Sequence, residues 1–159
     1  MEPTKSYSFG AASQKALVGV HPDLVKVLTT AITNSPIDFS INEGVRSLAT
    51  QQKYYTWGRT VINPNTGPLP GKPFGDTNTN ADGVVHKSNH QKKADGYGHA
   101  VDLYPYINGK IDFGAGATLV TIANHIKKVA ETLEIAITWG GDWKPPIAPV
   151  DKPHFQLKQ

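Results

Sequence analysis

The chain has 159 residues and a formal net charge of +3, and domains of about 100–200 residues are common, so one domain is expected. It has no cysteine, which excludes disulfides, thiolate metal sites and a cysteine nucleophile, so any metal must be held by His, Asp or Glu. No apolar run approaches the roughly 18 residues of a membrane span, and the N-terminus lacks the apolar stretch of a secretory signal. The excess of Lys and Arg over Asp and Glu is too small and too dispersed along the chain to favour a specific nucleic-acid partner.

The first sixty residues predict helices that flank one strand. A short helix is expected near residues 13–17, and a longer one begins at Pro22, because proline suits the first helical position. That helix ends at residues 34–36, and residues 37–41 alternate apolar and polar side chains, as a half-buried strand does. A further helix is expected over residues 47–55. The apolar stripe of the long helix consists of Leu24, Val27, Leu28 and Ile32.

Residues 58–89 predict a long irregular loop, since they are rich in proline and glycine and show no hydrophobic period. Within it, oxygen-bearing side chains alternate along residues 76–83 in the manner of a calcium loop, and Gly83 follows them. The closing glutamate of such a loop is missing, because Asn89 occupies its place. A Ca²⁺ site at 76–83 and a solvated flexible loop are therefore both open readings.

The second half of the chain predicts strands around one long helix. Asn108-Gly109 is a strong signal for a tight turn between two strands. The helix has a broad apolar face. The predicted segments are strands at 99–106, 110–113, 135–139 and 154–157 and the helix at 116–134. Together these elements predict a single α+β domain over residues 1–159, with a small, mainly antiparallel sheet packed on helices.

Histidines are the most informative side chains for chemistry. Three of the six lie within fourteen residues, namely His86, His90 and His99. A catalytic zinc takes three protein ligands and keeps one position open, and the spacing alone leaves the third ligand undefined. His154 is a good candidate, because it begins an apolar strand just after Asp151.

The remaining histidines favour structural roles. His21 precedes the proline of a helix, so we expect it to be structural or exposed, and His125 lies on the polar side of the long helix, so we expect it at the surface. Strand alternation turns His99 away from Asp102. Asp142 lies between Trp139 and Trp143, where an aspartate is usually a structural hydrogen-bonding partner.

Ordered motifs resemble a known enzyme family. Ser88-Asn89-His90, Gly98-His99-Ala100-Val101-Asp102 and Asp151-Lys152-Pro153-His154 are similar to the motif set of the zinc D-Ala-D-Ala carboxypeptidase family, which contains VanY-type and VanX-type enzymes and the phage L-alanyl-D-glutamate endopeptidases. Gly44-Val45-Arg46-Ser47 resembles the family's upstream arginine motif. Trp139-Gly140-Gly141-Asp142-Trp143 is especially similar to the phage endolysin branch. The resemblance covers roughly residues 20–157.

The resemblance implies a role for five residues. His90, Asp102 and His154 would hold one Zn²⁺, which activates a water molecule. Asp151 would be the general base, on the loop before the last strand. Arg46 would stabilise the developing oxyanion or clamp a substrate carboxylate, for which a planar guanidinium is well suited.

The spacing of one motif departs from the family pattern. The usual histidine lies seven residues before the aspartate, where this chain has Asp95, whereas His90 lies twelve before Asp102. An insertion around residues 92–96 explains this and keeps Ser-x-His intact. The rival hypothesis makes Asp95 the metal ligand.

The resulting functional prediction is a compact phage-type endolysin that cleaves peptidoglycan stem peptides between L-alanine and D-glutamate. It would be a monomer without a separate wall-binding domain, made in the cytoplasm of the host bacterium and released to the wall in the periplasm by a holin-type partner. The alternatives are a D-Ala-D-Ala carboxypeptidase or dipeptidase of the same family, a zinc-bearing wall-binding module without catalysis, and a basic nucleic-acid binder.

Overall fold

A computed structural model of the chain describes residues 6–46, 89–114, 116–144 and 150–158. The predicted helix at 47–55, most of the predicted loop at 58–89 and the calcium-like segment at 76–83 lie outside these residues. The elements, in chain order, are α1 (Ala11–Ala16), α2 (Pro22–Thr33), β1 (Phe39–Glu43), β2 (Ala100–Ile107), β3 (Lys110–Ile111), α4 (Gly116–Thr132), β4 (Ile137–Trp139), the 3₁₀ turn η2 (Gly140–Asp142) and β5 (His154–Leu157).

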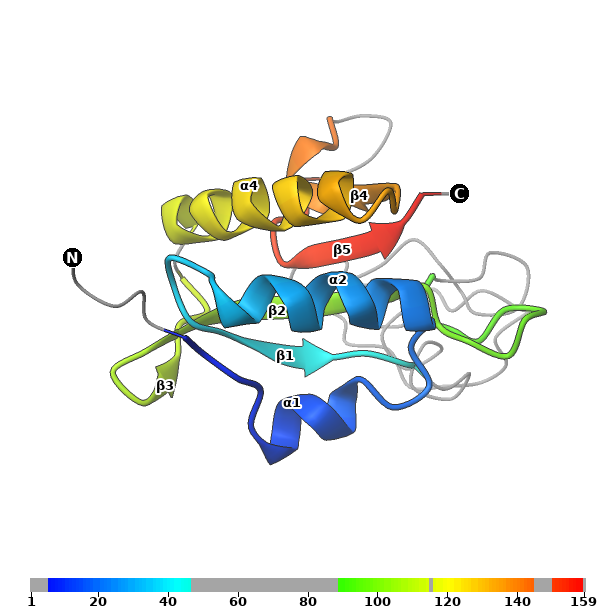
Figure 1. The fold of residues 1–159 in the computed structure, drawn as a ribbon, viewed down its shortest axis with the longest axis horizontal. Helices are drawn as coiled ribbons and strands as arrows, with labels where there is room; N and C mark the ends of the chain where they lie inside the picture. The colour runs from blue at the N-terminus through cyan, green and yellow to red at the C-terminus, as the bar shows by residue number, and fades with distance from the viewer. Residues whose placement is uncertain (1–5, 47–88, 115, 145–149, 159) are drawn as a thin grey trace, which may run out of the picture.

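The strands form one antiparallel sheet. Their order is β1-β2-β5-β4, and β3 pairs with the far end of β2. The long strand β2 is therefore central, with β1 on one side and β5 on the other (Figure 1). The prediction of an α+β fold with a mainly antiparallel sheet is confirmed.

Helices α2 and α4 pack against each other and cover one face of the sheet (Figure 1). Val101 and Leu103 of β2 and Phe155 and Leu157 of β5 belong to the buried core between helices and sheet. Because successive side chains of a strand point to opposite faces, the intervening Asp102, His154 and Gln156 lie on the sheet's other face. These three polar side chains are thus carried by strands whose opposite face is packed in the core.

Several element boundaries differ from the predictions for local reasons. β1 begins at Phe39 because Ser35 Oγ accepts the N–H of Ile37 and forms a turn there. β4 begins at Ile137 because the N–H of Ile135 donates to Ala130 O and belongs to the end of α4. The predicted turn is confirmed, with positive φ at Asn108 and Gly109. In the described part of the chain, no helix is long and apolar enough to span a membrane.

Candidate metal centre

Two of the candidate ligands lie side by side on adjacent strands. Asp102 of β2 and His154 of β5 are direct partners in the antiparallel register, a position in which side chains of neighbouring strands interact. Asp102 Oδ1 lies 3.4 Å from His154 Nδ1. On the other side of β2, Glu43 of β1 is the register partner of Asp102. Strand pairing therefore brings Glu43, Asp102 and His154 into one row.

His90 reaches this row from a turn that precedes β2. Its carbonyl accepts the N–H of Arg46 at 2.8 Å, and its ring Nδ1 lies 2.9 Å from Gly44 O. Its Nε2 lies 3.2 Å from His154 Nδ1 and 3.4 Å from Asp102 Oδ1. Gly44 itself lies against the carbonyl of Ala16, with which a Cβ would collide, so only glycine fits at this position.

The three donor atoms form a triangle with sides of 3.2, 3.4 and 3.4 Å. Donors that bind a tetrahedral zinc at about 2.0–2.1 Å lie about 3.3 Å from one another. Asp102 Oδ1 is buried without a hydrogen-bond partner, which is costly unless something compensates its charge. The residues therefore fit a divalent ion in size and in chemistry.

Hydrogen bonds to the outer ring nitrogens fix which nitrogens face the centre. His90 Nδ1 faces Gly44 O, a carbonyl toward which it can act only as a donor, and His154 Nε2 lies 2.7 Å from Gln156 Oε1. If both outer nitrogens carry the proton, the inner His90 Nε2 and His154 Nδ1 present lone pairs to the same point as Asp102 Oδ1. Three acceptors that converge on one point need a cation between them.

The charges of Asp102 and His154 agree with this requirement. Burial would raise the pKa of Asp102, but the adjacent His90 and His154 outweigh burial and hold the pKa well below its usual range. Burial would lower the pKa of His154, but Asp102 and Gln156 outweigh it and raise the pKa. Both shifts mean that the centre favours positive charge on His154 and negative charge on Asp102.

Asp151 lies at the edge of the centre, before β5. Its carbonyl accepts the N–H of His154 at 3.1 Å, and its N–H donates to Gly140 O at 2.9 Å. A Cβ at Gly140 would collide with Asp151 O, so the glycine permits this close approach. Burial, and then the charge of Asp102, raise the pKa of the Asp151 carboxyl. A carboxyl with a raised pKa is suited to proton transfer near neutral pH.

Arg46 lies beside the metal centre, with its side chain largely buried. Its Nε donates to Glu43 Oε1 at 2.7 Å, its Nη2 also contacts that oxygen, and Nη2 lies 3.7 Å from Asp102 Oδ2. The guanidinium is thus held between two carboxylates of neighbouring strands. The structure brings all five predicted site residues into one region.

Most of the chain, including this centre, is similar to a known family of peptidases. A family model described as phage L-alanyl-D-glutamate peptidase matches residues 5–66 and 76–155. The chain belongs to the phage L-alanyl-D-glutamate peptidase family. The resemblance inferred from the ordered motifs is therefore confirmed.

Two relatives of the family illustrate the match. The L-alanyl-D-glutamate peptidase of Escherichia phage T5 is 29% identical over 138 residues, which are 87% of this chain and 82% of that protein. The crystal structure of the Serratia marcescens L-Ala D-Glu endopeptidase ChiX is similar with a TM-score of 0.66 and 29% identity, over 96% of this chain and 91% of that one.

The groups of this peptidase that contact the outer sides of the candidate ligands were not predicted from the sequence. Gln156 Oε1 accepts from His154 Nε2 and also from Asn89 Nδ2, at 2.7 and 2.9 Å. Gln156 lies two residues after His154 on β5, so strand alternation could have placed it on the same face. The ring of Trp143 also lies 5.0 Å from that of His154. Gly44 O, which orients His90, has no sequence signal, because any residue supplies a carbonyl.

Replacing Gln156 with leucine is expected to weaken zinc binding about 10–100-fold, since outer hydrogen bonds that orient a ligating histidine have effects of this size. The measurement is zinc affinity by competition with a chromophoric chelator. Gln14→Leu, which removes a glutamine contact to Phe9 O near α1, is the matched control and should keep wild-type affinity. Equal affinities in the two variants would contradict an orienting role for Gln156.

His21, Asp95 and His99 lie outside this centre, and His86 lies outside the described residues. Asp95 lies in a different group from Asp102 and His154: its Oδ2 lies 2.7 Å from His99 Nε2, and the two gather with His21. Residues 92–96 protrude as a turn, in which the N–H of Lys93 donates to Tyr97 O. Because this turn closes on itself, His90 lies beside Asp102 and His154 despite the longer spacing.

Two predictions about surface side chains have different outcomes. His125 is not a surface residue: it is half-buried, and its Nε2 lies 2.9 Å from Ala31 O, so it links α4 to α2. The reason is that α2 packs over this side of α4, which helical periodicity alone does not reveal. Asp142 is a structural partner as predicted, since it accepts from Lys127 Nζ at 2.6 Å. Trp139 is part of the buried core.

Proposed function

We propose that this chain hydrolyses the L-alanyl-D-glutamate bond of peptidoglycan stem peptides, with one Zn²⁺ held by His90, Asp102 and His154. The observation that carries the proposal is the convergence of two imidazole nitrogens and one buried carboxylate oxygen, in a member of a peptidase family. Two imidazoles with one carboxylate are a common ligand set for catalytic zinc, and they leave a coordination position open.

Zinc, when bound, would polarise the scissile carbonyl and lower the pKa of a water molecule toward about 7. The protein's own residues manage the protons. Asp151, at the edge of the centre and with a raised pKa, would accept the proton of the attacking water and deliver it to the leaving amine. This delivery is essential because an unprotonated amine is a poor leaving group.

Arg46 would act at the rim of the same centre. Its guanidinium is near Asp102, so it can hold that carboxylate in place, and a substrate carboxylate or developing oxyanion would gain charge stabilisation there. The pairing with Glu43 fixes the direction of the planar fork. Positioning of Asp102 and stabilisation of the substrate are thus compatible roles for this side chain.

Defined stem peptides with mass spectrometry of the products test the specificity. We expect the zinc-loaded protein to release L-alanine-terminated and D-glutamate-initiated fragments. Release of terminal D-alanine would instead support the carboxypeptidase or dipeptidase alternative. Binding to purified wall without any cleaved bond would support a non-catalytic wall-binding module.

The proposed biological setting follows from the same substrate. We propose that the protein acts as a monomer on the bacterial wall in the periplasm, after synthesis in the host cytoplasm and release with the help of a holin-type partner. The net charge of +3 would favour approach to an anionic wall.

A further inference from the structure

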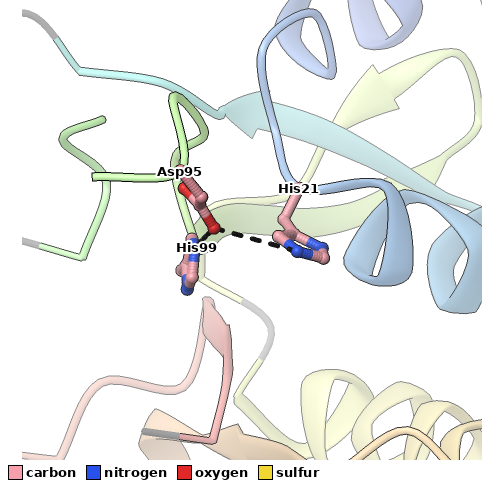
Figure 2. A group of neighbouring side chains, drawn as sticks. All are labelled: His21, Asp95 and His99. Atoms are coloured by element: carbon pink, nitrogen blue, oxygen red, sulfur yellow. Dashed lines mark hydrogen bonds and ion pairs between the residues drawn. The ribbon is translucent and has the colours of Figure 1, made fainter. Parts of the chain in front are cut away.

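A second group of metal-binding side chains lies outside the proposed active site. His21, Asp95 and His99 each offer one ligand atom, and these atoms lie within 4.8 Å of one another. Figure 2 shows that Asp95 and His99 come from one segment and His21 from another, and that the three side chains gather at one place. His21 immediately precedes α2, Asp95 belongs to the turn at residues 92–96, and His99 immediately precedes β2. We propose that this group is a second site for a divalent transition-metal ion.

The backbone that carries the group is tied together independently of the side chains. The N–H of His21 donates to Gly98 O at 2.9 Å, and the N–H of Gly98 donates to Gly19 O at 3.0 Å. These bonds form a parallel bridge between Val20 and Gly98. The segments before α2 and before β2 are thereby fixed beside each other, so little ordering is needed when an ion binds.

The Asp95 carboxylate is aimed into the group. Its Oδ1 accepts the N–H of Tyr97 at 3.0 Å, which leaves Oδ2 directed at both rings, 2.7 Å from His99 Nε2 and 3.9 Å from His21 Nε2. The rings of His21 and His99 contact each other edge to face, with centroids 5.1 Å apart. Small shifts of the three side chains would place an ion among these atoms.

The donor chemistry and the exposure indicate the kind of ion. Two imidazoles and one carboxylate favour zinc and similar transition metals over Ca²⁺ and Mg²⁺, which prefer oxygen ligands. The side chains of His21, Asp95 and His99 are 25, 39 and 15% exposed. An ion can therefore enter from solvent and complete its coordination with water.

The site should bind zinc more weakly than the buried centre. His21 Nδ1 accepts the N–H of Asp23 and caps α2, so Nε2 carries the ring proton when no ion is present. Ligation through Nε2 moves that proton to Nδ1 and gives up the cap bond. At the buried centre, by contrast, the outer ring nitrogens already face acceptors, so ligation through the inner nitrogens gives up no such bond.

Counting bound Zn²⁺ by equilibrium dialysis and elemental analysis tests the proposal. We expect two ions in the wild type, one in His154→Ala, and none in the double variant His154→Ala/Asp95→Ala. If the buried centre alone were misassigned, the wild type would bind one ion that Asp95→Ala removes and His154→Ala keeps, which would still support the second site. A wild-type ion count that Asp95→Ala leaves unchanged would overturn it.

Matched variants separate ligation from a loss of folding. His99→Gln should weaken binding of the second ion at least about tenfold, since even the loss of a partner that orients a ligand costs about 10–100-fold in metal affinity, with an unchanged circular dichroism spectrum. Asp112→Asn is the control, because Asp112 accepts a backbone N–H two residues ahead just as Asp95 does but belongs to no such group. Equal weakening in the Asp112 variant would overturn the assignment.

Discussion

Asp151→Asn is expected to lower kcat for stem-peptide hydrolysis about 10²–10⁴-fold, which is the usual contribution of a positioned general base. The reason is that the amide keeps the shape of Asp151 but cannot accept the proton of the attacking water. Because Asp151 is not among the three converging donors, zinc should remain bound at the buried centre. Steady-state kinetics together with zinc content per chain measure both parts of the expectation.

The control for this experiment is Asp142→Asn. Asp142 is exposed and pairs with Lys127 at 2.6 Å, and exposed ion pairs contribute little to stability. Its variant should retain activity. If Asp151→Asn lysed wall preparations as fast as the wild type, Asp151 would not be the base, and a binding role without catalysis would become the better account.

His90→Ala and His154→Ala are each expected to empty the buried centre and to reduce peptidase activity to background. Either change leaves Asp102 facing one imidazole instead of two, so the ion loses one of three ligands and the charge balance around the buried oxygen. Zinc content and hydrolysis of a defined stem peptide are the two measurements. His125→Gln is the control, because His125 lies between α2 and α4, and it should remain active.

Asp95→Ala distinguishes the two explanations of the unusual motif spacing. If residues 92–96 are an insertion, this variant keeps its peptidase activity at saturating zinc, whatever happens to the second ion. Loss of activity in Asp95→Ala with full activity in His90→Ala would mean that Asp95, and not His90, is the functional ligand.

The elements that the sequence predicted well are those with a strong local signal. Pro22 and the apolar stripe after it define α2, and Asn108-Gly109 defines the hairpin. The boundaries that differ depend on single hydrogen bonds, such as that between Ser35 Oγ and the N–H of Ile37. A hydrophobic pattern does not predict these bonds, because they join polar groups of the backbone and of short side chains.

The sequence by itself determined the family, the α+β class and the residues proposed as ligands and base, because ordered motifs and residue chemistry are properties of the chain. Only the tertiary structure decided how these residues meet. The β2–β5 register sets Asp102 opposite His154, and the closed turn at residues 92–96 lets His90 complete the triangle while Asp95 joins His21 and His99. The physical reason is that both groups join side chains that are far apart in the chain: His154 follows His90 by 64 residues, and His99 follows His21 by 78. Contacts over such separations arise from strand pairing and loop closure rather than from local sequence.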